Sequence, residues 1–120
     1  MKQKILIADD EECIRFTFSD FLQGAGYHVE TADSLTNCIN RMQQEPFDLL
    51  FLDIGFGTEN GIEAIQALKT LQPKCRVVII TGSPRQKSLV QAKRYGAIDY
   101  LVKPIHQVSL IYNTKRVLAR

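Results

Sequence analysis

Several side chains that can do chemistry follow directly after short apolar runs of the sequence. Asp9 and Asp10 follow the first such run, Asp53 ends the third, Thr81 ends the fourth and Lys103 follows the fifth. If these runs are parallel strands of one sheet, their carboxyl ends meet at one edge, where ligands bind in open α/β sheets. The sequence therefore predicts one site built from three carboxylates, a hydroxyl and an ammonium group.

The three carboxylates at this edge predict a cation site. Carboxylates brought within a few ångströms repel one another, so that either some of them take up protons or a cation joins them. A set of oxygen ligands without His or Cys favours Mg²⁺. The alternative is that adjacent acids only complement the positive end of the following helix. We prefer that alternative for Glu11 and Glu12, and the cation site for Asp9 and Asp10.

Asp53 ends a nearly apolar run, so we expect its carboxylate at a rigid and dry position. A carboxylate beside a metal ion can act as a nucleophile towards phosphorus and form an acyl phosphate. Phosphoryl transfer needs positioning and charge neutralisation, which a metal ion and Lys103 would provide. The Thr81 hydroxyl would form a hydrogen bond to a phosphoryl oxygen. Taken singly, Lys103 also fits a solvated lysine before a turn, and Thr81 a β-branched residue that finishes a strand.

The elements that must position these residues alternate along the chain. Short stretches typical of strands cover residues 4–8, 27–32, 47–53, 76–81 and 99–102, and the central ones are nearly all apolar. Amphipathic stretches with helical spacing follow them, over residues 14–24, 34–42, 62–71, 84–95 and from 105 to 118. Five such units predict an α/β fold with a single doubly wound five-stranded parallel sheet and helices on both faces.

Length and composition exclude several classes of protein. The 120 residues suffice for one domain with a real core. The longest purely apolar runs have four residues, far short of the ~20 that span a bilayer. Two aspartates stand where a signal peptide needs its apolar stretch, and the three cysteines (Cys13, Cys38 and Cys75) lack zinc-site spacing. We therefore expect a cytoplasmic protein with reduced thiols and no membrane contact.

The net charge of +2 hides an asymmetry between the two halves of the chain. Residues 1–60 hold 4 basic and 11 acidic residues, a net of −7, whereas residues 61–120 hold 11 basic and 2 acidic residues, a net of +9. The last two predicted helices carry Arg85, Lys87, Lys93, Arg94, Lys115, Arg116 and Arg120. These cations form either a solvated surface or a docking surface for an acidic partner or for a further domain of the same protein. Their dispersal along helices argues against direct binding of nucleic acid.

The order of these motifs resembles the receiver domain of bacterial two-component response regulators over essentially the whole chain. The resemblance rests on Asp9-Asp10, Asp53, Thr81, Lys103-Pro104 and the loop that leads into Gly61-Ile62-Glu63. It implies a flavodoxin-like (βα)5 fold with strand order 2-1-3-4-5 and a receiver domain over residues 1–120. Whether an output domain follows Arg120 stays open.

The resemblance also implies a role for each site residue. Asp53 would accept a phosphoryl group from the phosphohistidine of a sensor histidine kinase or a phosphotransfer protein. Asp10, Asp53 and the backbone carbonyl of Gly55 would bind Mg²⁺ directly, with Asp9 acting through water, and Lys103 would pair with the phosphoryl group. Such a domain is a signalling switch and not an enzyme, because it catalyses only its own phosphoryl transfer and autodephosphorylation.

Activation would move two further side chains. Thr81 would approach the phosphoryl group, and Tyr100 matches the aromatic position that turns inward; the alternative for Tyr100 is a half-buried strand tyrosine without a switching role. The change would reach the face formed by the fourth helix, fifth strand and fifth helix, where an output domain or partner would bind. Gly57 stands where the family commonly has proline, and Gly82 stands where it often has alanine. These differences leave open how rigid the loop is and how long the acyl phosphate lasts.

Three other functions compete with this interpretation. The alternative that stays open is a phosphorylation-independent docking module of the same fold. A haloacid-dehalogenase type phosphatase would need its nucleophile in a DxD motif after the first strand, which is missing here. A flavin-binding domain would need a phosphate-cradling loop there, where Asp9, Asp10, Glu11 and Glu12 would repel the phosphate.

Overall fold

Five parallel strands form the sheet of the computed structural model, which describes residues 2–55, 61–83 and 85–119, without the side chains of residues 86 and 87. The strands are β1 (Lys4–Ala8), β2 (His28–Ala32), β3 (Leu49–Asp53), β4 (Arg76–Thr81) and β5 (Ala97–Val102). Their order in the sheet is β2-β1-β3-β4-β5, and every neighbouring pair is parallel. The predicted fold and strand order are confirmed.

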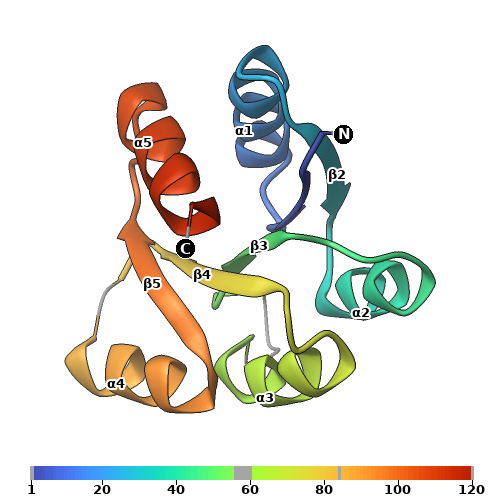
Figure 1. Ribbon diagram of the computed structural model, residues 1–120. Helices are drawn as coiled ribbons and strands as arrows, with labels where there is room; N and C mark the ends of the chain where they lie inside the picture. Colours follow the sequence, from blue (N-terminus) through green and yellow to red (C-terminus); the bar gives the residue numbers. More distant parts are fainter. Residues whose placement is uncertain (1, 56–60, 84, 120) are drawn as a thin grey trace.

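Helices cover both faces of the sheet, as Figure 1 shows. They are α1 (Glu12–Gly24), α2 (Leu35–Gln44), α3 (Gly61–Leu71), α4 (Gln86–Tyr95) and α5 (Gln107–Leu118). In Figure 1, α1 and α5 lie on one face, and α2, α3 and α4 lie on the other. Within the described residues, no helix is long and apolar enough to cross a membrane.

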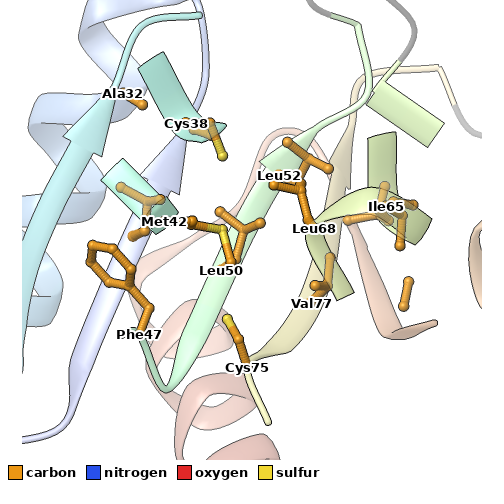
Figure 2. Close-up of a cluster of buried hydrophobic side chains, with 14 of the residues drawn as sticks. Ala32, Cys38, Met42, Phe47, Leu50, Leu52, Ile65, Leu68, Cys75 and Val77 are labelled. Atoms are coloured by element: carbon orange, nitrogen blue, oxygen red, sulfur yellow. The ribbon is translucent and has the colours of Figure 1, made fainter. Parts of the chain in front are cut away.

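Each face of the sheet has its own apolar core because successive side chains of a strand point to opposite faces. On β1, Leu6 and Ala8 join the cluster beneath α2, α3 and α4, whereas Ile5 and Ile7 join the cluster beneath α1 and α5. Figure 2 shows the first cluster. Strands buried on both faces read as continuous apolar runs, which explains why the sequence revealed them clearly.

Local signals set some of the boundaries of the elements. The Ser34 hydroxyl caps α2 by accepting a hydrogen bond from the Asn37 N–H at 3.1 Å. Gly96 follows α4 with a φ of 120°, a left-handed conformation that favours glycine. β5 begins two residues earlier than predicted, because a register shift between Val77 and Val78 lets Ala97 pair with β4.

The strands β2 and β3 begin one and two residues later than predicted. Asp48 lies just before β3, and its side chain ties this segment to the start of β1, because its Oδ2 accepts a hydrogen bond from the Lys4 N–H at 2.8 Å.

The cysteines Cys13, Cys38 and Cys75 are all free thiols, as predicted. Burial raises the pKa of the Cys38 and Cys75 thiols to about 12, which keeps both protonated.

Candidate functional site

The carboxyl edge of the sheet brings together three of the predicted side chains. Asp9 follows β1 and is fully buried, and Asp53 ends β3 with 5% of its surface exposed. Lys103 follows β5, and its side chain is 14% exposed. Because the strands are parallel, these three positions share one edge although they lie 44 and 50 residues apart.

The Lys103 ammonium group is the centre of the site. Its Nζ lies 3.0 Å from Asp9 Oδ2, 3.0 Å from Glu11 Oε1 and 3.4 Å from Asp53 Oδ2. Burial by itself lowers the pKa of Lys103, but the close contacts with Glu11 and Asp9 and the charge of Asp53 outweigh it and raise that pKa. The lysine is therefore a permanent positive charge at this edge.

Asp9 is held by contacts at both carboxylate oxygens. Its Oδ1 accepts a hydrogen bond from the Glu11 N–H at 2.8 Å, and its Oδ2 faces Lys103. Arg15 donates a hydrogen bond to the Asp9 backbone carbonyl at 2.9 Å, which fixes the turn between β1 and α1. Burial raises the pKa of the Asp9 carboxyl, and the Glu11 N–H and Lys103 oppose that shift.

Four carboxylates at this edge could hold a metal ion. One oxygen from each of Asp9, Asp10, Glu11 and Asp53 lies within 4.8 Å of the others, and Asp10 and Glu11 are exposed while Asp9 and Asp53 are buried. The donors are all oxygen atoms, the set that suits a hard divalent cation such as Mg²⁺. The residues present therefore fit the predicted ion.

The loop after β3 fixes the orientation of the Asp53 carboxylate. The Gly55 N–H donates a hydrogen bond to Asp53 Oδ1 at 2.9 Å. A Cβ on Gly61 would lie 3.0 Å from the Asp53 backbone oxygen and 3.0 Å from the Ile54 Cα, so only glycine lets α3 start this close to β3. Gly57, which sequence analysis singled out, lies outside the described residues.

Thr81 lies at the same edge, although its hydroxyl is turned towards the following loop. Thr81 is 4% exposed, and its Oγ1 accepts a hydrogen bond from the Ser83 N–H at 3.1 Å. As an acceptor in that bond, the hydroxyl keeps its own proton for donation. The Lys103 N–H donates to the Thr81 backbone carbonyl at 2.8 Å, and the Lys103–Pro104 peptide bond is cis.

Tyr100 lies on β5 with 38% of its surface exposed, so its ring is turned outwards in this structure. It stands opposite Ile79 of β4. Its backbone N–H donates a hydrogen bond to Asp99 Oδ1 at 2.8 Å. The switching role that the resemblance gives to Tyr100 stays a prediction, as do the roles of the other site residues.

The sequence predicts a place for Glu11 at the rim of the site but does not predict its ion pair with Lys103. We expected its charge to serve the N-terminal end of α1, yet Glu11 makes no side-chain capping bond there and instead accepts from Lys103. Its place two residues after Asp9 was the available signal, because a turn at that point returns the side chain to the sheet edge.

The predicted positive face on α4, β5 and α5 needs one correction. Arg116 is not a free surface cation, because it forms a close ion pair with Asp99 of β5. The side chain of Lys87 and the whole of Arg120 lie outside the described residues. The same three elements also expose apolar side chains, namely Val90, Tyr100, Val102, Val108 and Tyr112.

The sequence of this chain matches a known family over most of its length. The family described as response regulator receiver domain matches residues 5–115. The alginate biosynthesis transcriptional regulatory protein AlgB of Pseudomonas syringae pv. tomato is 42% identical over 101 residues, which are 84% of this chain and 22% of that protein. The transcriptional regulatory protein ZraR of Escherichia coli is 30% identical over 115 residues, 96% of this chain and 26% of that protein. The chain therefore spans about a quarter or less of these relatives.

Solved structures agree with the sequence comparison. A CheY-like response regulator receiver domain protein from Methanospirillum hungatei superposes with a TM-score of 0.96 at 27% identity, over 99% of this chain and 95% of that one. A response regulator from Burkholderia pseudomallei superposes with a TM-score of 0.88 at 30% identity, over 98% of this chain and 72% of that one. That structure holds a phosphorylated aspartic acid, a calcium ion and citrate.

Proposed function

The chain belongs to the response regulator receiver domain family, and from this membership we propose that it is a phosphorylation-dependent switch with Asp53 as the phosphoacceptor. The phosphoryl group comes from the phosphohistidine of a sensor histidine kinase or a phosphotransfer protein. The observation that carries the proposal is the partly buried Lys103 ammonium group, 3.0 Å from Asp9 and 3.4 Å from Asp53. The phosphorylated aspartic acid of the Burkholderia pseudomallei relative supports it.

In the transfer step, an oxygen of the Asp53 carboxylate forms a bond to phosphorus while the bond from phosphorus to the histidine nitrogen breaks. The electron pair of the broken bond stays on the imidazole. The Gly55 N–H at 2.9 Å orients the carboxylate, and Lys103 offers positive charge where the phosphoryl oxygens arrive. Hydrolysis of the acyl phosphate by water would return the switch to its initial state. In both steps the domain acts only on its own phosphoryl group.

Asp10, Asp53 and the Gly55 carbonyl are the residues that would hold Mg²⁺, with Asp9 reaching it through water. The bound ion supplies positive charge that neutralises the phosphoryl oxygens. The close approach of the four carboxylates supports this assignment. Asp9 has Lys103 at its inner oxygen, which supports a water-mediated contact in place of a direct one.

Phosphorylation would change the charge and the hydrogen bonding of the site. It replaces one negative charge by about two and adds acceptor oxygens. The Thr81 hydroxyl turns from Ser83 to donate to a phosphoryl oxygen, and Tyr100 moves inwards from its exposed position. A shift from ~1:99 to ~99:1 needs about 5.5 kcal/mol, which these contacts and the ion pair with Lys103 together must supply.

The surface that reports this change is the face of α4, β5 and α5. It exposes an apolar group of side chains, including Val108 with 80% of its surface exposed, beside the cations of α4 and α5. We assign to this face an output domain or a protein partner. The regulatory names of the relatives and their greater length support that assignment.

An NMR titration with beryllofluoride and Mg²⁺, a mimic of the phosphoryl group, tests the switch. We expect shifts at Asp53, Thr81 and Lys103 and, through Tyr100, over the face of α4, β5 and α5. Thr81→Ala should keep the shifts at Asp53 but lower the ratio of active to inactive conformation by about tenfold. The shifts on the face of α4, β5 and α5 should become smaller accordingly. An unchanged spectrum of the face in the parent protein would contradict the switch and favour a docking module.

A further inference from the structure

A large groove lies at the amino edge of the sheet, opposite the phosphoacceptor site. Its volume is about 1290 Å³, and it is lined by residues at or before the starts of β1, β2, β3 and β4, among them Lys4, His28, Asp48 and Arg76. The strands have five or six residues, so the groove lies roughly 16 Å from Asp53.

The inner part of the groove is apolar. Met42, Phe47 and Cys75 line it, and all three are buried members of the core beneath α2, α3 and α4. Figure 2 shows Phe47 and Cys75 at the end of this cluster that lies away from Leu52. The exposed Pro46 and Pro73 continue the apolar lining outwards.

Two loops border the groove, and side-chain bonds hold both of them in place. Gln72 accepts from the Phe47 N–H at 2.9 Å and donates to the backbone oxygens of Met42 and Glu45, each at 2.7 Å. Lys69 donates to the backbone oxygens of Pro73 at 2.9 Å and Cys75 at 2.6 Å. The groove is therefore largely pre-formed, as ligand sites usually are.

The polar lining gives the groove a positive rim. Glu45 forms an ion pair with Lys4 Nζ at 3.0 Å, whereas Asp48 only accepts a hydrogen bond from the uncharged backbone N–H of Lys4. The lysine and arginine side chains of the lining outnumber these two carboxylates by four to two. Lys2 and Lys74, by contrast, form no ion pair with any part of the chain that the structure describes, and both are exposed. Unpaired cations beside an apolar recess complement a ligand with an anionic head and an apolar body.

We propose that this groove binds an amphipathic organic anion. The apolar body packs along Pro46, Phe47 and Pro73, and the carboxylate or phosphate group faces Lys2 and Lys74. The function is separate from phosphorylation of Asp53, because the groove shares no residue with the carboxyl edge of the sheet. It gives the domain a second input, a small anionic metabolite or lipid-like acid, at the opposite end of the strands.

An NMR titration of the isotopically labelled protein with sodium octanoate tests the proposal. We expect saturable shifts at the amides of Phe47, Asp48, Gln72 and Cys75. 1-Octanol and octyltrimethylammonium, which carry the same chain without the negative charge, should bind more weakly. The double variant Lys2→Gln, Lys74→Gln should raise the dissociation constant of octanoate about fivefold.

The control double variant Lys93→Gln, Lys115→Gln removes two exposed charges elsewhere and should leave the dissociation constant unchanged. Each of the four substitutions is at an exposed side chain, so the fold is retained. Absence of saturable shifts at the groove would overturn the proposal. Equal binding of octanoate, octanol and octyltrimethylammonium would also overturn it, as would equal effects of the two double variants.

Discussion

The Nζ of Lys103 lies 3.0 Å from Oδ2 of the buried Asp9, so that one ion pair joins the carboxyl ends of β5 and β1. These strands are not neighbours, because β3 and β4 lie between them in the sheet. The lysine reaches Asp53 from the same position, at 3.4 Å. It can therefore exchange a contact with Asp9 for one with an arriving phosphoryl group without leaving the site.

Removal of the lysine should destabilise the fold when no divalent metal is present. Lys103→Ala leaves Asp9 and Asp53 buried without their cationic partner, and we expect the free energy of unfolding at neutral pH to fall by about 3 kcal/mol. Urea unfolding with a chelator measures it. Lys93→Ala, which removes an exposed lysine of α4, should change this free energy by less than about 0.5 kcal/mol. Equal effects of the two variants would refute the central role of Lys103.

Asp10→Asn should separate metal binding from folding. Without metal, this variant should unfold with an equal or slightly higher free energy, because one of four crowded carboxylates is neutralised. With Mg²⁺ at about 100 times its dissociation constant, the parent protein should gain about 2.7 kcal/mol of stability, most of which the variant should lose. Thermal unfolding across a Mg²⁺ series measures both, and Asp20→Asn should behave as the parent does. A variant with the parent's Mg²⁺ response would exclude Asp10 as a ligand.

Gly61→Ala should strain the connection between β3 and α3. The added Cβ would lie 3.0 Å from the Asp53 backbone oxygen, and we expect a loss of about 1–3 kcal/mol together with altered amide shifts at Asp53. Gly24→Ala in α1 is the matched control, because its Cβ would meet nothing within 4 Å. That control should be neutral or slightly stabilising, by up to about 0.5 kcal/mol. If both variants left the free energy of unfolding unchanged, the close approach of Gly61 to the Asp53 backbone would be contradicted.

Asp99 should make stability depend on pH in the acid range. Burial alone would raise the pKa of Asp99, but the Tyr100 N–H, Arg116 and Asn113 outweigh it and hold that pKa below the ordinary value of 3.8. The unfolded state therefore binds the proton more tightly. The stabilisation is present above pH ~4 and is lost as the pH falls through the folded-state pKa.

Asp99→Asn should accordingly cost about 1 kcal/mol at neutral pH, a modest value because the pair with Arg116 is partly exposed. The difference from the parent protein should shrink as the pH falls below about 4 and through the lowered folded-state pKa of Asp99. Urea unfolding at a series of pH values measures it. A difference that stays constant with pH would show that the carboxylate charge does not contribute.

The fold could be predicted because its central strands β1, β3 and β4 are buried on both faces. Such strands read as separate apolar runs, and their parallel arrangement places Asp9, Asp53, Thr81 and Lys103 at one edge without any knowledge of loops. The strand order followed only from the resemblance to receiver domains, since alternation of strands and helices fits several orders. The start of β5 was missed because a register shift leaves no signal in the sequence.

Side-chain contacts between distant segments were beyond sequence reasoning. Glu11 turns back to Lys103, which lies 92 residues away, and Gln72 bonds to backbone groups 25 to 30 residues away. Each contact depends on loop conformations that the three-dimensional packing sets, not on a pattern of residue types. The Arg116 pair with Asp99 was hidden for the same reason.

The proposed switch depends on phosphorylation of Asp53, which intact-mass spectrometry measures directly. After incubation with acetyl phosphate and Mg²⁺, the parent protein and the control Asp20→Asn should each gain the mass of one phosphoryl group. Asp53→Asn should gain none, and omission of Mg²⁺ should abolish the gain. An unmodified parent protein, or an Asp53→Asn variant that is phosphorylated to the same extent, would contradict the proposed switch.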